Sequence, residues 1–125
     1  MTSTIGRAAG LPLVTKMRTE IKKLWVAALK SGKYKQGSMY LRQTYDGVKE
    51  YCCLGVLCDI YSKRRRKYVD WDNSILPIEV MNWAGLQDPN PTVKTKKTNQ
   101  NCLSSVNDIG GYTFKAIAKL IERDL

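Results

Sequence analysis

Three of the four cysteines lie in one short apolar stretch, so thiol chemistry is the first reactivity that the sequence offers. The stretch runs from Tyr51 to Cys58 and places Cys52, Cys53 and Cys58 among Leu, Val and Gly. A thiol at a helix N-terminus can form a reactive thiolate, but the chain has no histidine to act as its base. The same absence excludes Ser-His and His-metal mechanisms. We therefore predict buried core thiols, since free cysteine behaves as a small hydrophobe.

A zinc site is the sharper alternative for these cysteines. Only Cys102 could complete a set of four sulfur ligands, and the other three show no C-x2-C spacing. We expect no metal site and no cofactor. The neighbouring Asp59 has two interpretations: a carboxylate directed toward water or a basic neighbour, or a buried carboxylate that faces a pocket.

Basic residues are concentrated in one half of the sequence. Residues 16–67 hold 14 Lys and Arg against four acidic residues, a net of +10, whereas residues 68–125 have a net of −1. This excess indicates an anionic partner, and the tyrosines interleaved with it suit phosphate contacts and base stacking. A solvated face that aids solubility is the alternative. The residues expected to bind the ligand are Lys33, Tyr34, Lys35, Gln36, Arg42, Arg64, Arg65, Arg66 and Trp71.

A helix, which must support part of this basic region, is predicted near the N-terminus. Over residues 16–31 apolar side chains, beginning with Met17, recur at helical spacing. Thr15 would cap the start, and Gly32 would end the helix in a left-handed conformation. Residues 1–14 mix small and polar types without a period, so we predict a flexible arm there.

A β-hairpin is predicted next. Residues 40–45 and 48–52 flank an Asp-Gly pair at 46–47, which suits a type I′ turn because both central residues need a positive φ. Tyr45 would then pair with Val48. The core-like face would contain Leu41, Tyr45, Val48 and Cys52, and the opposite, basic face Tyr40, Arg42, Thr44, Lys49 and Tyr51.

The remaining pattern completes a single α+β domain over residues 15–125. A stretch over 53–61 that is apolar on all sides indicates either a buried helix or a buried strand. We favour a central helix that ends before the basic run 63–67, with Gly55 at a close contact. A third strand could extend the hairpin. The later elements are a short helix over 77–83, a long loop over 87–101, one or two helical turns over 103–108, and a C-terminal amphipathic helix capped by Thr113.

Four segments of the chain resemble a family of small proteins encoded by tailed bacteriophages. They have the pattern W-x5-SGxYxQ, YCCLGVLCD, WAGL and ND, and they lie at Trp25–Gln36, Tyr51–Asp59, Trp83–Leu86 and Asn107–Asp108. The resemblance implies expression in the cytoplasm of an infected bacterium, where thiols stay reduced. It brings a setting and assigns no residue roles. By analogy alone, such accessory proteins often act against host defences or host nucleic-acid machinery.

These observations favour a binding protein over an enzyme. The leading hypothesis is a non-enzymatic protein that binds an anionic nucleotide-type ligand, which in a phage could sequester a host immune signalling nucleotide. Alternatives are a DNA- or RNA-binding protein that uses the same basic face and an inhibitor that docks on an acidic host protein. We expect no membrane span, because no run approaches ~18 apolar residues. A homo-oligomer could form through Trp25, Trp71 and Trp83.

Overall fold

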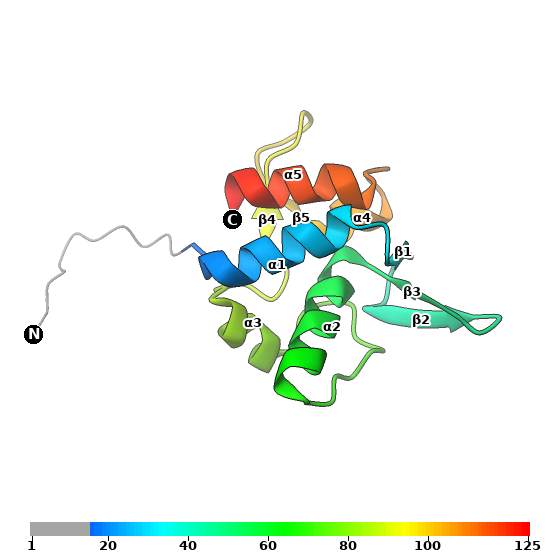
Figure 1. Cartoon of the computed structure of the whole chain (residues 1–125). Helices are drawn as coiled ribbons and strands as arrows, with labels where there is room; N and C mark the ends of the chain where they lie inside the picture. The colour runs from blue at the N-terminus through cyan, green and yellow to red at the C-terminus, as the bar shows by residue number, and fades with distance from the viewer. Residues whose placement is uncertain (1–15) are drawn as a thin grey trace, which may run out of the picture.

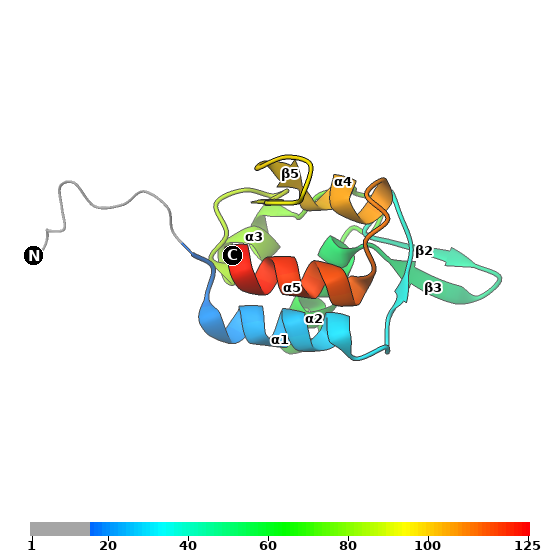
Figure 2. The ribbon, with the colours of Figure 1, turned by 90° about the horizontal axis from the view of Figure 1, so that it is seen from above.

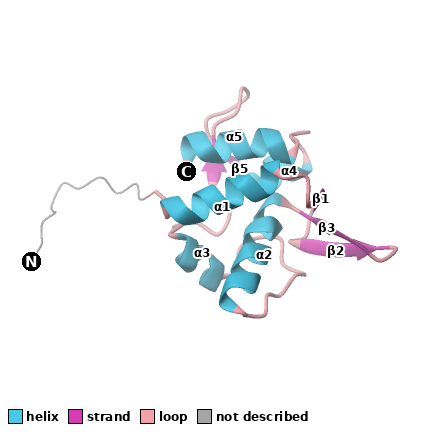
Figure 3. Ribbon diagram, in the orientation of Figure 1, coloured by secondary structure: helices cyan, strands magenta, loops and turns pink. Residues whose placement is uncertain are grey.

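The computed structural model describes residues 16–125, so the predicted arm over residues 1–14 lies outside the described residues. Helices and small sheets form one α+β domain, as predicted (Figures 1 and 3). The elements are α1 (Thr19–Lys30), β1 (Lys35–Gln36), β2 (Arg42–Tyr45), β3 (Val48–Tyr51), α2 (Cys53–Arg65), α3 (Ile78–Ala84), β4 (Thr92–Val93), β5 (Asn101–Cys102), α4 (Leu103–Asp108) and α5 (Phe114–Asp124).

The first and last helices lie side by side and close one side of the core (Figures 1 and 2). Each presents an apolar stripe at helical spacing, which is why two segments far apart in sequence pack together. The predicted C-terminal amphipathic helix is confirmed, and Thr113 caps it by accepting a hydrogen bond from the Ala116 amide at 3.2 Å. The buried side chains are Ile21, Trp25, Val26 and Leu29 of α1 and Phe114, Ile117, Ala118 and Ile121 of α5.

The start of α1 differs from the prediction. The helix begins at Thr19 rather than at residue 16, because the Arg18 amide donates to the Ala84 carbonyl at 2.9 Å and holds the preceding chain extended. Met17 is nevertheless buried, reaching the core from this extended segment. Met17 lies four positions before Ile21, so it fits helical spacing in the sequence although it precedes the helix. Gly32 has the predicted left-handed conformation, with φ +76°.

The central helix α2 is buried from Cys53 to Asp59 but is longer than predicted. It continues through the basic run and ends at Arg65, with Arg66 in the left-handed conformation at φ 54°. The prediction that it stops before residue 63 was wrong. Cations in the last turn are favourable because they complement the helix dipole. Gly55 does mark a close contact: a Cβ there would lie 1.7 Å from the Leu41 carbonyl oxygen.

The hairpin has the predicted register, with Tyr45 opposite Val48, and β1 adds a third strand parallel to β3. The predicted core-like face is only half right. Leu41 at the base is fully buried, but Tyr45 is 57% exposed because the hairpin projects from the helices (Figure 1). The projecting part of a two-stranded hairpin has no layer to pack against, so alternation in sequence does not guarantee burial.

The segment between α2 and α5 contains one ladder that the sequence analysis missed. The short helix α3 matches the prediction over 77–83, and Gly85 follows it with φ +76°. Within the predicted loop 87–101, β4 pairs antiparallel with β5. A ladder of two residues per strand is too short to show alternation, so only tertiary contacts establish it.

Candidate functional site

A row of aromatic side chains joins three elements on one side of the molecule. Tyr34, just before β1, packs edge-on against Tyr51 at 4.9 Å between ring centroids, and Tyr51 packs edge-on against Trp71 at 6.2 Å. The guanidinium of Arg42 lies 4.1 Å from the centre of the Trp71 ring, a cation–π contact. The fold thus brings together three predicted ligand residues, Tyr34, Arg42 and Trp71. We call Tyr34, Tyr51 and Trp71, together with Arg42 stacked on Trp71, the aromatic row.

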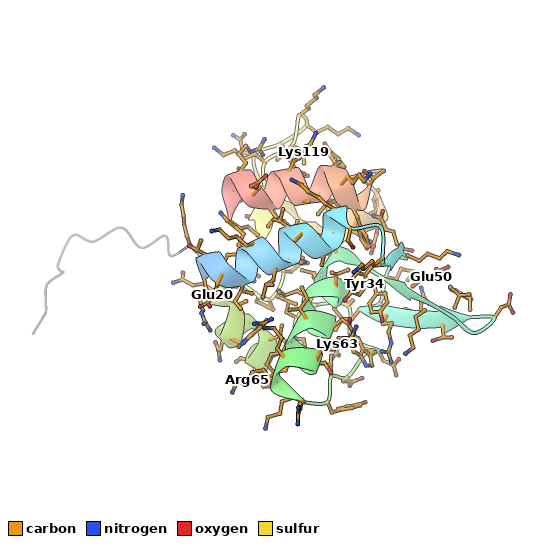
Figure 4. The ribbon with its side chains drawn as sticks, viewed as in Figure 1. Glu20, Tyr34, Glu50, Lys63, Arg65 and Lys119 are labelled. Atoms are coloured by element: carbon orange, nitrogen blue, oxygen red, sulfur yellow. The ribbon has the colours of Figure 1, made fainter. Side chains whose placement is uncertain are left out.

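Asp59 of α2 lies beneath the Tyr34 end of this row. Its side chain is 8% exposed, and its Oδ2 accepts a hydrogen bond from the Tyr34 hydroxyl at 2.5 Å. Lys63, one turn later, places its Nζ 2.9 Å from the same oxygen (Figure 4). Of the two interpretations of Asp59, the structure therefore has the carboxylate paired with a basic neighbour, although it is buried. A buried carboxylate needs such partners.

These contacts change the proton affinities of both partners of Asp59. Burial, followed by the hydrogen bond to the carboxylate, raises the pKa of Tyr34 well above its ordinary value. The hydrogen bond to Asp59 also raises the pKa of Lys63. Tyr34 therefore remains a neutral donor and Lys63 a cation throughout the physiological range. The contacts of Asp59 with Tyr34 and Lys63 hold the chain before β1 against α2. The Tyr34 hydroxyl is therefore already engaged in a hydrogen bond.

Two further predicted ligand residues have internal partners. Gln36 donates from Nε2 to Asn107 Oδ1 at 3.1 Å and to the Tyr112 carbonyl at 2.9 Å. Lys35 forms an ion pair with Glu50 at 3.3 Å. Asn107 is buried, and its Oδ1 also accepts from the Cys53 amide at the start of α2. The sequence analysis missed this connecting role of Asn107, and the Asn-Asp pair in the resemblance was the only signal that could have indicated it.

The other predicted cations are exposed at the end of α2 and before β1. Lys33, Arg64, Arg65 and Arg66 form no ion pair with any residue in 16–125. The basic run leads through Lys67 directly into Tyr68, which is 83% exposed. Two cations in the last turn of α2, two cations just after it and an exposed aromatic ring therefore follow one another in sequence, a combination that suits phosphates and a stacked base.

A shallow hollow of about 380 Å³ lies beside this segment. Arg42 and Trp71 line it together with two exposed tyrosines that the sequence analysis did not select, Tyr40 and Tyr68. Asp70 and Asp72 line it as well and oppose a phosphate placed inside. We use the name basic aromatic surface for Arg64, Arg65, Arg66, Lys67 and Tyr68.

The cysteines follow the core prediction. Cys52, Cys53 and Cys58 are buried, and burial raises the pKa of all three thiols, for Cys52 to about 11. Cys102 is partly exposed, and its contact with the Ser105 hydroxyl lowers its pKa. No group of three or more candidate metal ligands occurs among residues 16–125. Cys52 caps the N-terminus of α2, because its Sγ accepts a hydrogen bond from the Gly55 amide.

Fewer tryptophan side chains are available for an oligomer interface than predicted. Trp25 is fully buried, and its Nε1 donates to the Cys53 carbonyl at 2.9 Å, so it is not available for an interface. Trp83 is half-buried and packs on Tyr61 with 5.3 Å between centroids. Trp71 is half-buried beneath Arg42.

Comparisons with known proteins add one finding about the family. A family model described as a domain of unknown function (DUF8296) matches residues 17–125. No curated protein and no solved structure gives a significant match. None of the helices in the described part of the chain is long and apolar enough to cross a membrane.

Proposed function

The chain belongs to the DUF8296 family, and we propose that it binds single-stranded nucleic acid through the basic aromatic surface. The observation that carries the proposal is the run of cations from Arg64 to Lys67, which form no ion pair within residues 16–125 and lead into the exposed ring of Tyr68. Cations placed along the nucleic-acid backbone and aromatic rings that stack on any base are the two features of sequence-independent binding to single-stranded nucleic acid. The open shape of the surface fits a strand that passes across it.

The resemblance to tailed-bacteriophage proteins supports the setting of this proposal. In the cytoplasm of an infected bacterium, a small basic protein would cover single-stranded DNA or RNA and so interfere with host defence or host nucleic-acid machinery. No catalytic group is required of the chain, in agreement with a non-enzymatic role.

Nucleotide binding, the leading hypothesis from sequence, is the second candidate. One observation favours it: a hollow of about 380 Å³ walled by Tyr40, Tyr68 and Trp71 has the size of a small-molecule site. The two carboxylates in the same wall weigh against it, since they repel the phosphates that Arg42 would attract. For this reason we place it second.

The test removes the cations without straining the backbone. In the triple variant Arg64→Gln, Arg65→Gln and Arg66→Gly, glycine suits the left-handed conformation at position 66. Its affinity for a fluorescent 20-nucleotide single strand should fall on the order of tenfold or more at about 50 mM salt, since roughly three phosphate contacts are lost. The melting temperature should stay close to that of the wild type.

A matched variant controls for net charge. Lys23→Gln, Lys115→Gln and Lys119→Gln remove three exposed cations from α1 and α5. Figure 4 shows Lys119 of α5 at the opposite end of the view from Arg65 of α2. This variant should retain most of the affinity. Equal losses in both triple variants would show that only net charge matters and would overturn the proposed site.

A further inference from the structure

A second hollow, of about 550 Å³, lies apart from the basic aromatic surface. It is bounded by the loop between β4 and β5, by the end of α4, and by the turn that leads into α5. It shares no lining residue with the hollow beside Trp71. In Figure 1 the β4–β5 loop is at the top of the molecule and the C-terminal end of α2 at the bottom. A ligand in this hollow would therefore bind at a different place from single-stranded nucleic acid at the C-terminal end of α2.

The lining of this hollow is apolar on one side and cationic on the other. Val106, Ile109 and Tyr112 contribute the apolar wall, and Ile109 is 84% exposed to solvent. Lys96 and Lys97 stand on the loop opposite. No carboxylate from residues 16–125 lines the hollow, in contrast to the hollow beside Trp71. Its volume lies within the range of small-molecule sites, which combine an apolar wall with a few polar groups.

The loop that carries the two lysines is held by its own hydrogen bonds. Asn101 donates from Nδ2 to the Thr95 hydroxyl at 2.9 Å and to the Thr98 carbonyl at 3.0 Å. The Thr95 amide donates to the same carbonyl at 2.9 Å. A loop closed in this way loses less conformational entropy when a ligand engages its lysines.

The opposite wall is fixed as well. Tyr112 is anchored through its carbonyl, which accepts from Gln36 of β1, and Val106 is buried in the core. Of the three apolar residues named for this wall, Ile109 is the one with most of its surface exposed, and water against such a side chain is unfavourable. The site thus has one apolar surface to cover and two ammonium groups to neutralise.

We infer that this hollow binds a small amphiphilic anion, whose apolar body covers Ile109 and Tyr112 and whose single anionic head group lies against Lys96 and Lys97. The inference is independent of nucleic-acid binding. Charge complementarity selects the head group, because the described lining contains two cations and no acid. The probe is octanoate, with octanol and octylammonium as neutral and cationic molecules of the same chain length.

The experiment titrates each probe into the full chain and follows backbone amide shifts by NMR. Octanoate should bind saturably and at least about tenfold more tightly than octanol, and octylammonium should bind most weakly. The shifts should be largest at residues 95–97 and 109–113. Lys96→Gln with Lys97→Gln should abolish the preference for octanoate over octanol and leave single-strand binding unchanged.

Two further variants separate the parts of the site. Ile109→Ser, at an exposed position, should weaken octanoate and octanol by similar factors without loss of folding. Lys115→Gln with Lys119→Gln, which removes equal charge from the exposed side of α5, should keep the preference. Absence of saturable binding, shifts centred elsewhere, or a preference that survives the Lys96 and Lys97 changes would overturn the inference.

Discussion

At the scale of single residues, the side chains that carry the resemblance connect elements to one another. Trp25 donates to the Cys53 carbonyl, Tyr34 to Asp59, and Gln36 to Asn107. These groups are buried or partly buried polar atoms with specific partners, and unpaired they would cost free energy. The fold therefore explains these residue types, whereas Lys33 and Arg64 to Arg66 form no ion pair with any residue that the structure describes.

Tyr34 gives a direct test of this distinction. Tyr34→Phe keeps the edge-on contact with Tyr51 but removes one of the two donors to buried Asp59. The free energy of unfolding should fall by about 1–3 kcal/mol, the cost of a buried group that loses its partner. Chemical denaturation measures this loss. Binding of a single strand by the folded variant should be unchanged.

The contrasting variant is Tyr68→Ala. Its ring is exposed, so stability should change by no more than about 0.5 kcal/mol. Affinity for a single strand should fall by about 1–3 kcal/mol if a base stacks there. The opposite pattern, with binding lost in Tyr34→Phe and kept in Tyr68→Ala, would reverse the roles assigned to the two tyrosines.

The thiols give a second prediction at this scale. In the native protein iodoacetamide should modify Cys102 first, because its pKa is lowered and its side chain is partly exposed. Cys52, Cys53 and Cys58 should react only after unfolding, since they are buried with raised pKa values. Mass spectrometry of peptides over time measures the order. Rapid native labelling of any buried thiol, or stoichiometric zinc, would contradict the core assignment.

At the scale of elements, the carboxylate of Asp124 holds the C-terminal end of α5 against Lys94, the residue that follows β4. Asp124 accepts from the Lys94 amide at 2.7 Å and from Arg123 at 2.6 Å. The hydrogen bond from Arg123 is the main cause that lowers the pKa of Asp124 from about 3.8 to about 2. A carboxyl whose pKa is depressed in the folded state stabilises the protein above its unfolded pKa. This contribution is lost as the pH falls through the folded value.

We therefore expect Asp124→Asn to lower the melting temperature at pH 7. The difference from the wild type should shrink between about pH 4 and pH 2, where the wild-type carboxyl takes up its proton. Thermal melts across this range measure it. Glu20→Gln, at an exposed pair on α1, is the control and should show little difference at any pH. A difference that stays constant down to pH 2 would argue against an electrostatic contribution.

At the scale of the whole molecule, salt dependence separates the two candidate functions. A single strand that contacts about four phosphates should show a slope of log affinity against log salt near −3, since each contact contributes about −0.7. Affinity would fall roughly fiftyfold between about 50 and 200 mM salt. A nucleotide in the hollow beside Trp71 carries few phosphates, so its slope should be shallow, about −1 to −2.

Thermal shifts complete this comparison. A nucleotide bound at 100 times its dissociation constant adds about 2.7 kcal/mol to stability, so a panel of cyclic and linear nucleotides would reveal it. We expect no nucleotide in the panel to stabilise the protein strongly at about 200 mM salt. A strong stabiliser under these conditions, together with weak binding of single strands, would make nucleotide sequestration the better proposal.

The sequence by itself determined the class of the fold and most of its elements. Apolar spacing predicts the helices that became α1 and α5, and the Asp-Gly pair predicts the hairpin with its register. These features depend on local periodicity and turn chemistry, which neighbours in sequence encode. The concentration of cations in residues 16–67 is likewise a property of the sequence alone.

Only the tertiary structure decided which polar side chains remain free for a ligand. Tyr34, Lys35 and Gln36 looked equivalent to Lys33 in sequence, yet each has a partner from another element: Asp59, Glu50 and Asn107. Likewise, burial at the base of the hairpin and exposure at Tyr45 depend on where the helices end. The two hollows also form from distant segments. The physical reason is that pairing and burial are set by contacts across the fold, which the order of residues along one element does not specify.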